Sequence, residues 1–122
     1  MKVKVSDIFD LKEGLTTISE KELPVGVAFK IQRINRVVGE ELKTAQGLRT
    51  KLVQKYKEKD LEDGRVKLKE DKLEEFNKEM DELSAQEVKL DIEKIKVEDL
   101  SSISVTPKSL GLIDTILEGG EQ

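Results

Sequence analysis

Cysteine and histidine are both absent from this chain of 122 residues. Their absence excludes disulfide bonds, thiolate nucleophiles, zinc sites built from Cys and His, and imidazole bases. Aromatic residues make up only 3% of the chain, so we expect a thin core of Leu, Ile and Val packed between helices. Because a long helix with short partners leaves part of its apolar stripe uncovered, we also expect self-association into a homo-oligomer.

Long apolar runs are missing as well. No stretch approaches the roughly 20 apolar residues that a transmembrane helix requires, and the first residues, MKVKVSD, do not lead into the apolar run of a signal peptide. We therefore expect no membrane association and a cytoplasmic location. The net charge of −4, from 26 acidic and 22 basic residues, makes nucleic acid an unlikely partner.

The strongest pattern in the sequence is one long amphipathic helix, predicted over residues 23–57 with Pro24 at its start, where proline suits the first helical position. Its apolar residues recur at steps of four and three, the heptad spacing of coiled coils, and Glu41 interrupts this apolar series. The series comprises Val27, Ile31, Ile34, Val38, Ala45, Leu48 and Leu52. Gly39 and Gly47 lie beside it, and are either tolerated small kinks or points where another backbone approaches closely.

Shorter elements flank the long helix on both sides. Residues 1–22 predict a short strand and a helix capped by Ser6 or Asp7. Residues 58–86 predict a charged turn, a short strand and a helix that folds back antiparallel on the carboxyl half of the long helix. The apolar faces of the two flanking helices are Ile8, Leu11, Leu15 and Ile18 in the first, and Leu73, Phe76, Met80 and Leu83 in the second.

Residues 87–122 predict short strands and a last helix, with Thr106 as its N-cap, Pro107 at its first position and a stop at residues 119–120. The predicted buried face of this last helix is Leu110, Ile113, Ile116 and Leu117. Together the four segments predict a single, mostly helical α+β domain. It has a long central helix, antiparallel shorter helices in a coiled-coil-like hairpin, and a small sheet of short strands.

Two parts of the sequence resemble each other. Residues 2–8, KVKVSDI, match residues 94–100, KIKVEDL, in a two-residue alternation that ends in an acidic helix start. The match is either chance in a Lys- and Val-rich chain or a repeat whose two copies lie side by side in one small sheet.

Paired carboxylates are the first candidates for chemistry, because two acids aimed into a cleft can act as general acid and base. Nearly every acid here has Lys or Arg three or four residues away, which is the pattern of a solvated helix face, so we predict no catalytic site. The pairs are Glu40–Glu41, Glu74–Glu75, Asp91–Glu93 and Glu98–Asp99. The sequence also lacks a glycine-rich phosphate loop and a serine elbow, and we expect no metal and no cofactor.

Three cations on the long helix, Lys30, Arg33 and Arg36, are the candidate binding residues. Near a helix start they suit a phosphate or an acidic partner surface. The alternative is that they are flanking charges, paired with acids of the first or the third helix. Three apolar residues off the main series face either the first helix or a neighbouring subunit: Val25, Phe29 and Val37.

Five short motifs occur in a fixed order over nearly the whole chain. They are LPV at residues 23–25, EEL at 40–42, EEFNKE at 74–79, VKLDI at 88–92 and IKVEDL at 95–100. In this order the chain resembles a family of small proteins of unknown function encoded by bacteriophages and prophages of low-GC Gram-positive bacteria. The resemblance implies a phage context and carries over no catalytic residue. The three glycines of the long helix depart from the family pattern.

From the resemblance and the predicted fold we expect a non-enzymatic interaction protein. One hypothesis is an accessory or structural component of the phage particle or of its assembly, which self-associates. The alternative is an intracellular antagonist of host defence that binds a host protein or sequesters a nucleotide signal. The partners would be further copies of the chain, or another phage or host protein, in the host cytoplasm or in the virion.

Overall fold

The computed structural model describes residues 1–118 and shows a mostly helical α+β protein. The α-helices are α1 (Val5–Ser19), α2 (Val25–Tyr56), α3 (Leu73–Ser84) and α4 (Pro107–Leu112), joined by the 3-10 helices η1 (Glu70–Lys72), η2 (Val97–Leu100) and η3 (Asp114–Ile116). The strands are β1 (Lys2–Lys4), β2 (Lys57–Asp60), β3 (Val66–Leu68), β4 (Glu87–Lys89), β5 (Ile95–Lys96) and β6 (Leu117–Glu118).

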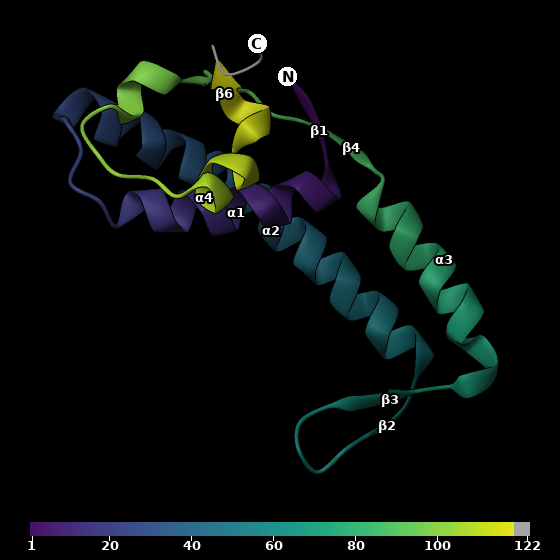
Figure 1. Cartoon of the computed structure of the whole chain (residues 1–122). Helices are drawn as coiled ribbons and strands as arrows, with labels where there is room; N and C mark the ends of the chain where they lie inside the picture. Colours follow the sequence, from purple (N-terminus) through teal and green to yellow (C-terminus); the bar gives the residue numbers. More distant parts are fainter. Residues whose placement is uncertain (119–122) are drawn as a thin grey trace.

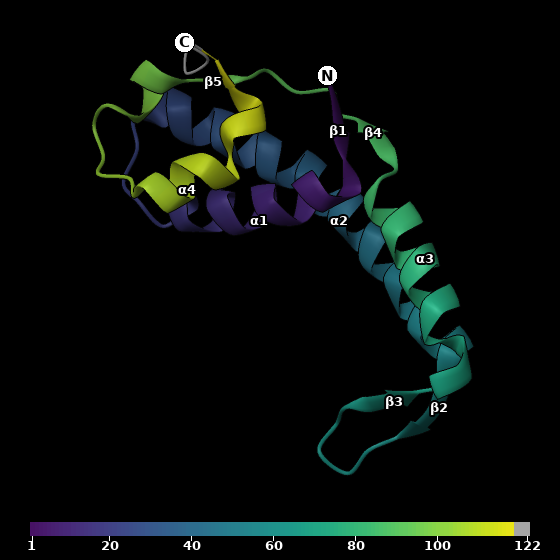
Figure 2. The ribbon, with the colours of Figure 1, turned by 45° about the vertical axis from the view of Figure 1, so that its right-hand side comes forward.

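Helix α2 is the axis of the molecule. Its 32 residues span about 48 Å at 1.5 Å per residue. Helices α1 and α4 gather along its first half, α3 runs antiparallel beside its second half, and the β2–β3 hairpin projects from the far end (Figures 1 and 2). We call residues 1–42 together with 87–118 the head, and residues 43–86 the arm.

The core of the head forms where α1 packs on the first half of α2. The apolar face predicted for α1 is completely buried, and α2 contributes the middle of its apolar series. Residues from β4 onward close the other side of this core. The buried side chains include Ile8, Leu11, Leu15 and Ile18 of α1, Ile31, Ile34 and Val38 of α2, and Leu90, Ile95, Leu100, Ile113, Ile116 and Leu117.

Gly14 lies at a close approach that the sequence did not reveal. A Cβ at this position would lie 2.6 Å from Ile113 Cγ2 and 3.0 Å from Leu112 Cβ. The end of α4 therefore packs directly on the α1 backbone. Gly39 and Gly47 have no atom of the described residues within 4 Å of a Cβ position, so nothing within residues 1–118 uses them as points of close approach.

The strands form three separate two-stranded sheets, not one. β1 pairs antiparallel with β4, β2 pairs antiparallel with β3, and β5 pairs in parallel with β6. The hypothesis that residues 2–8 and 94–100 share a sheet is therefore wrong, because each copy finds a different partner strand.

The two similar sequences nevertheless build the same joint between a strand and a helix. Asp7 Oδ2 accepts a hydrogen bond from the backbone N of Lys4 at 2.8 Å, and Asp99 Oδ2 accepts one from the backbone N of Lys96 at 3.1 Å. The predicted cap of α1 needs correction, because the helix starts at Val5 and Asp7 acts from inside the first turn.

The arm consists of the second half of α2, the β2–β3 hairpin, η1 and α3. The charged segment predicted as a turn after the long helix instead begins as strand β2 (Lys57–Asp60), and the turn that follows is tight, with Gly64 at φ +86°. The helix predicted from residue 70 begins as η1 and becomes α3 at Leu73. No residue of α3 is fully buried. Leu48, predicted in the apolar series of α2, is exposed because α3 does not cover it.

The last helix begins as predicted. Thr106 Oγ1 accepts a hydrogen bond from Ser109 N at 3.1 Å, and Pro107 is the first helical residue. The helix is shorter than expected and ends at Leu112, so Ile113 and Ile116 are buried from the turn that follows it. The predicted stop at residues 119–120 lies outside the described residues.

Candidate functional site

A groove runs along the first half of α2, between this helix and the loop that follows β4. Its volume is about 560 Å³. The α2 wall is basic and apolar, and the loop wall is acidic. The lining residues are Gly26, Phe29, Lys30, Arg33, Ile34, Arg36 and Val37 on α2, with Asp91, Ile92 and Glu93 opposite. The structure thus brings all three predicted cations to one groove.

The three cations are in different environments. The Lys30 ammonium lies 3.5 Å from Asp99 Oδ2, and both side chains are mostly buried. The Arg33 guanidinium lies over the Phe29 ring, with Cζ 5.3 Å from the ring centroid. Arg36 is exposed, and no ion pair within residues 1–118 includes it. Lys30 is thus paired with an acid, as the alternative of flanking charges expected, but this acid lies on η2 and not on the first or third helix.

Two large apolar side chains beside the groove are exposed to solvent. Val25 is 87% exposed and Phe29 is 64% exposed. They do not pack on α1, whereas Val37 is half-buried against the head core. The sequence offered a signal for this exposure, because the two residues are four apart on the helix face opposite the apolar series.

Some polar residues of α2 line the groove, and others contact α1. Asn35 Nδ2 donates a hydrogen bond to Ser19 Oγ at 2.6 Å, so this amide ties α2 to the end of α1. The acids Asp91 and Glu93 sit opposite the arginines. The groove therefore combines both signs of charge with apolar contact area. It can hold a polar, partly apolar protein segment more readily than a simple polyanion.

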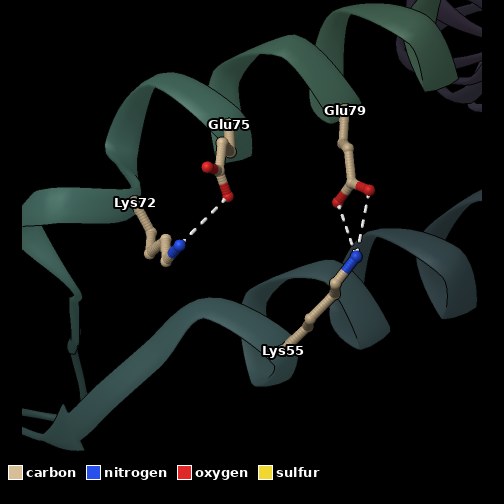
Figure 3. Close-up of polar contacts among 4 residues, drawn as sticks. All are labelled: Lys55, Lys72, Glu75 and Glu79. Atoms are coloured by element: carbon tan, nitrogen blue, oxygen red, sulfur yellow. Dashed lines mark hydrogen bonds and ion pairs between the residues drawn. The ribbon is translucent and has the colours of Figure 1, made fainter.

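A second polar cluster lies where α2 and α3 meet in the arm. The Lys55 ammonium donates to both carboxylate oxygens of Glu79, at 3.0 and 3.3 Å (Figure 3). The hydrogen bond from Lys55 lowers the pKa of Glu79, and the same contact raises the pKa of Lys55. Burial, followed by the neighbouring Glu79 carboxylate, raises the pKa of Tyr56 above its ordinary value of 10.0.

The arm cluster is structural in character. Tyr56 packs edge-on against Phe76, with ring centroids 5.8 Å apart. The Lys55–Glu79 ion pair next to it joins the same two helices. No group of three or more acids that could hold a metal ion occurs in the described part of the chain.

No protein-family model matches the chain, and neither a curated protein nor a solved structure matches it. The functional argument therefore depends on the groove and on the exposed surface of α2. Within residues 1–118, no helix is both long enough and apolar enough to cross a membrane.

Proposed function

We propose that the protein is a non-enzymatic interaction protein encoded by a phage or prophage, and that it serves as an accessory or assembly component that associates with itself. The phage context in this proposal comes from the sequence resemblance alone. The observation that carries the interaction and self-association is the exposure of Val25 and Phe29 next to Arg33 and Arg36. Exposed apolar residues beside arginines are typical of protein interfaces, where aromatic and arginine side chains are enriched.

The groove offers less to a nucleotide signal. Lys30 is already paired with Asp99, and Asp91 and Glu93 lie in the same groove as the free arginine Arg36. Two carboxylates near a phosphate repel it, and the residues that line the groove include no glycine-rich backbone cradle to offset this repulsion. A protein partner, which can present both charges, suits the groove better.

The test is the mass of the purified protein in solution, measured by light scattering across a dilution series and combined with electron microscopy. We expect an oligomer of defined size that dissociates on dilution. An assembly component should further form rings or fibres of fixed symmetry at high concentration. A monomer at every concentration, together with tight binding of a nucleotide by calorimetry, would contradict the proposal and favour the antagonist of host defence.

A further inference from the structure

The outer face of α2 is exposed to solvent, and only where Phe29 and Arg36 border the groove does the loop after β4 lie opposite it. Neither α1 nor α3 packs on it, and all its residues are exposed. The residues that define this outer face follow one another at steps of four and seven, which keeps them on one side of a helix. They are Val25, Phe29, Arg36, Glu40 and Gly47.

The outer face is self-complementary about its centre at Val38. Arg36 lies two residues before this position and Glu40 two residues after it. Phe29 lies nine residues before it and Gly47 nine residues after it. In an antiparallel helix pair with its two-fold axis at this centre, a residue before the centre faces the residue of the other copy that lies equally far after it. Each such contact therefore occurs twice.

We propose that two copies of this chain pair antiparallel through the outer faces of α2. Arg36 of each copy then faces Glu40 of the other, which gives two ion pairs. Phe29 of each copy lies over Gly47 of the other, where a bare backbone leaves room for the ring. Gly47 has nothing from its own described chain within 4 Å of a Cβ position, so this space is open to a partner.

The Phe29 ring already has one intramolecular contact. Arg33 stacks on it at 5.3 Å, which restricts the ring and lowers the entropy cost of docking. The pairing also gives a reason for a glycine at position 47, which weakens an exposed helix and allows no close contact with another element of residues 1–118.

Like charges do not face each other in this arrangement. Arg33 of one copy and Lys43 of the other lie at the same height along the paired helices, but positions ten residues apart differ by about 80° around a helix. They therefore lie toward opposite edges of the contact. The stretch from Phe29 to Gly47 covers about 27 Å of helix, which is a small interface, so we expect a dimer with a dissociation constant of roughly micromolar order.

This inference rests on the proposed self-association and specifies its contact, and charge reversal tests it. In light scattering and sedimentation, Arg36→Glu and Glu40→Arg should each raise the dissociation constant at least about tenfold, because each places two like-charged pairs in the interface. The double variant R36E/E40R restores both pairs with inverted sign, and we expect its dissociation constant within about threefold of the original. Gly47→Leu should weaken the dimer while leaving the helix intact by circular dichroism.

Matched controls are available at the exposed end of α1. Glu20→Arg and Lys21→Glu reverse the same charges at positions that are not on the outer face of α2, and should leave the dimer unchanged. If the protein is a dimer that none of the α2 variants affects, or if the double variant fails to recover, the proposed contact is wrong while self-association stands. A monomer at all concentrations would overturn both the contact and the self-association.

Discussion

The head and the arm use similar amphipathic helices but bury them to different depths. In the head, α1, α2, α4 and the turns after β5 surround one another, and the central side chains are completely enclosed. In the arm, α3 meets α2 alone, and among the apolar residues only Ala45 and Tyr56 are buried. The comparison shows that the apolar stripe specifies which side of a helix is covered. The number of elements packed around that side decides how completely its side chains are buried.

The arm is consequently held by fewer and more local contacts. Its junction depends on the Tyr56–Phe76 ring contact and the Lys55–Glu79 ion pair, and the tip is a two-stranded hairpin. Regions with few buried apolar contacts open at lower free energy than the rest of a protein. We therefore expect the arm amides to exchange with solvent deuterium sooner than those of α1.

The largest contrast should come from removing a leucine side chain in each region. Leu15 in the head is 0% exposed, and Leu73 in the arm is 41% exposed. Leu15→Ala should lower the free energy of unfolding by about 2–5 kcal/mol, because it leaves a cavity, and Leu73→Ala by less than about 1 kcal/mol. Urea denaturation followed by circular dichroism measures both. Equal losses would contradict the comparison and show that Leu73 is covered in solution.

Replacing glycine with alanine should change the free energy of unfolding in opposite directions on α1 and α2. Gly14→Ala places a Cβ against Ile113 and Leu112, and overpacking of this kind costs about 1–3 kcal/mol, partly offset by about 1 kcal/mol of helix propensity. Gly39→Ala meets nothing within 4 Å in the described chain and should stabilise the protein by up to about 1 kcal/mol. Thermal unfolding of the two variants checks both signs. A stabilising Gly14→Ala would mean that α4 does not rest on α1.

Local features of the fold could be predicted from the sequence. Three such features are the buried face of α1, the extent of α2 and the N-cap at Thr106. Each depends on residues within one or two helical turns of one another. Strand pairing could not be predicted, because residues 2–8 and 94–100 have the same local pattern and only the folded chain decides their partners. The contact of Gly14 with Ile113 is equally long-range and leaves no periodic signal.

At the candidate site, too, local features could be predicted from the sequence and long-range contacts could not. Lys30, Arg33 and Arg36 could be selected because they lie within two turns of one helix. The partner of Lys30, Asp99, is 69 residues away in sequence, and the opposite wall of the groove comes from the loop after β4. The position of Phe29 opposite the apolar series was a signal for its exposure, but the sequence alone could not state that no second layer within residues 1–118 covers this side of α2.

A smaller effect is expected at the joint between β1 and α1, within the head. Asp7→Ala removes the acceptor for Lys4 N and a favourable charge at the helix start, and should cost about 1 kcal/mol. Asp7→Asn keeps an acceptor oxygen and should cost about half as much. Urea midpoints of the two variants and the parent compare them. If Asp7→Ala is neutral, the shared joint contributes nothing to stability, and the similarity of residues 2–8 and 94–100 has no structural consequence.

The smallest expected effects are electrostatic, and they lie in the arm. Tyr56 is the only tyrosine and the chain has no tryptophan, so tyrosinate absorbance reports this one hydroxyl. Burial and Glu79 raise the pKa of Tyr56, and the native protein should therefore titrate above the denatured one. Because the folded pKa is the higher, this contribution to stability is complete below about pH 10 and is lost as the pH rises through the folded value.

Two variants separate the charges around Tyr56. Glu79→Gln removes the carboxylate that raises the pKa of Tyr56 and should lower it, while Lys55→Gln removes an ammonium that lowers this pKa and should raise it. Lys72→Gln is the matched control, since Lys72 pairs with Glu75 at 3.6 Å on the same arm (Figure 3) and should leave the titration unchanged. Opposite shifts from the first two variants require Tyr56 to remain beside the α2–α3 ion pair in solution. Identical titration curves for all three variants would mean that α2 and α3 have already separated at the pH where tyrosine ionises. The arm would then be less stable, relative to the head, than its smaller buried apolar area predicts.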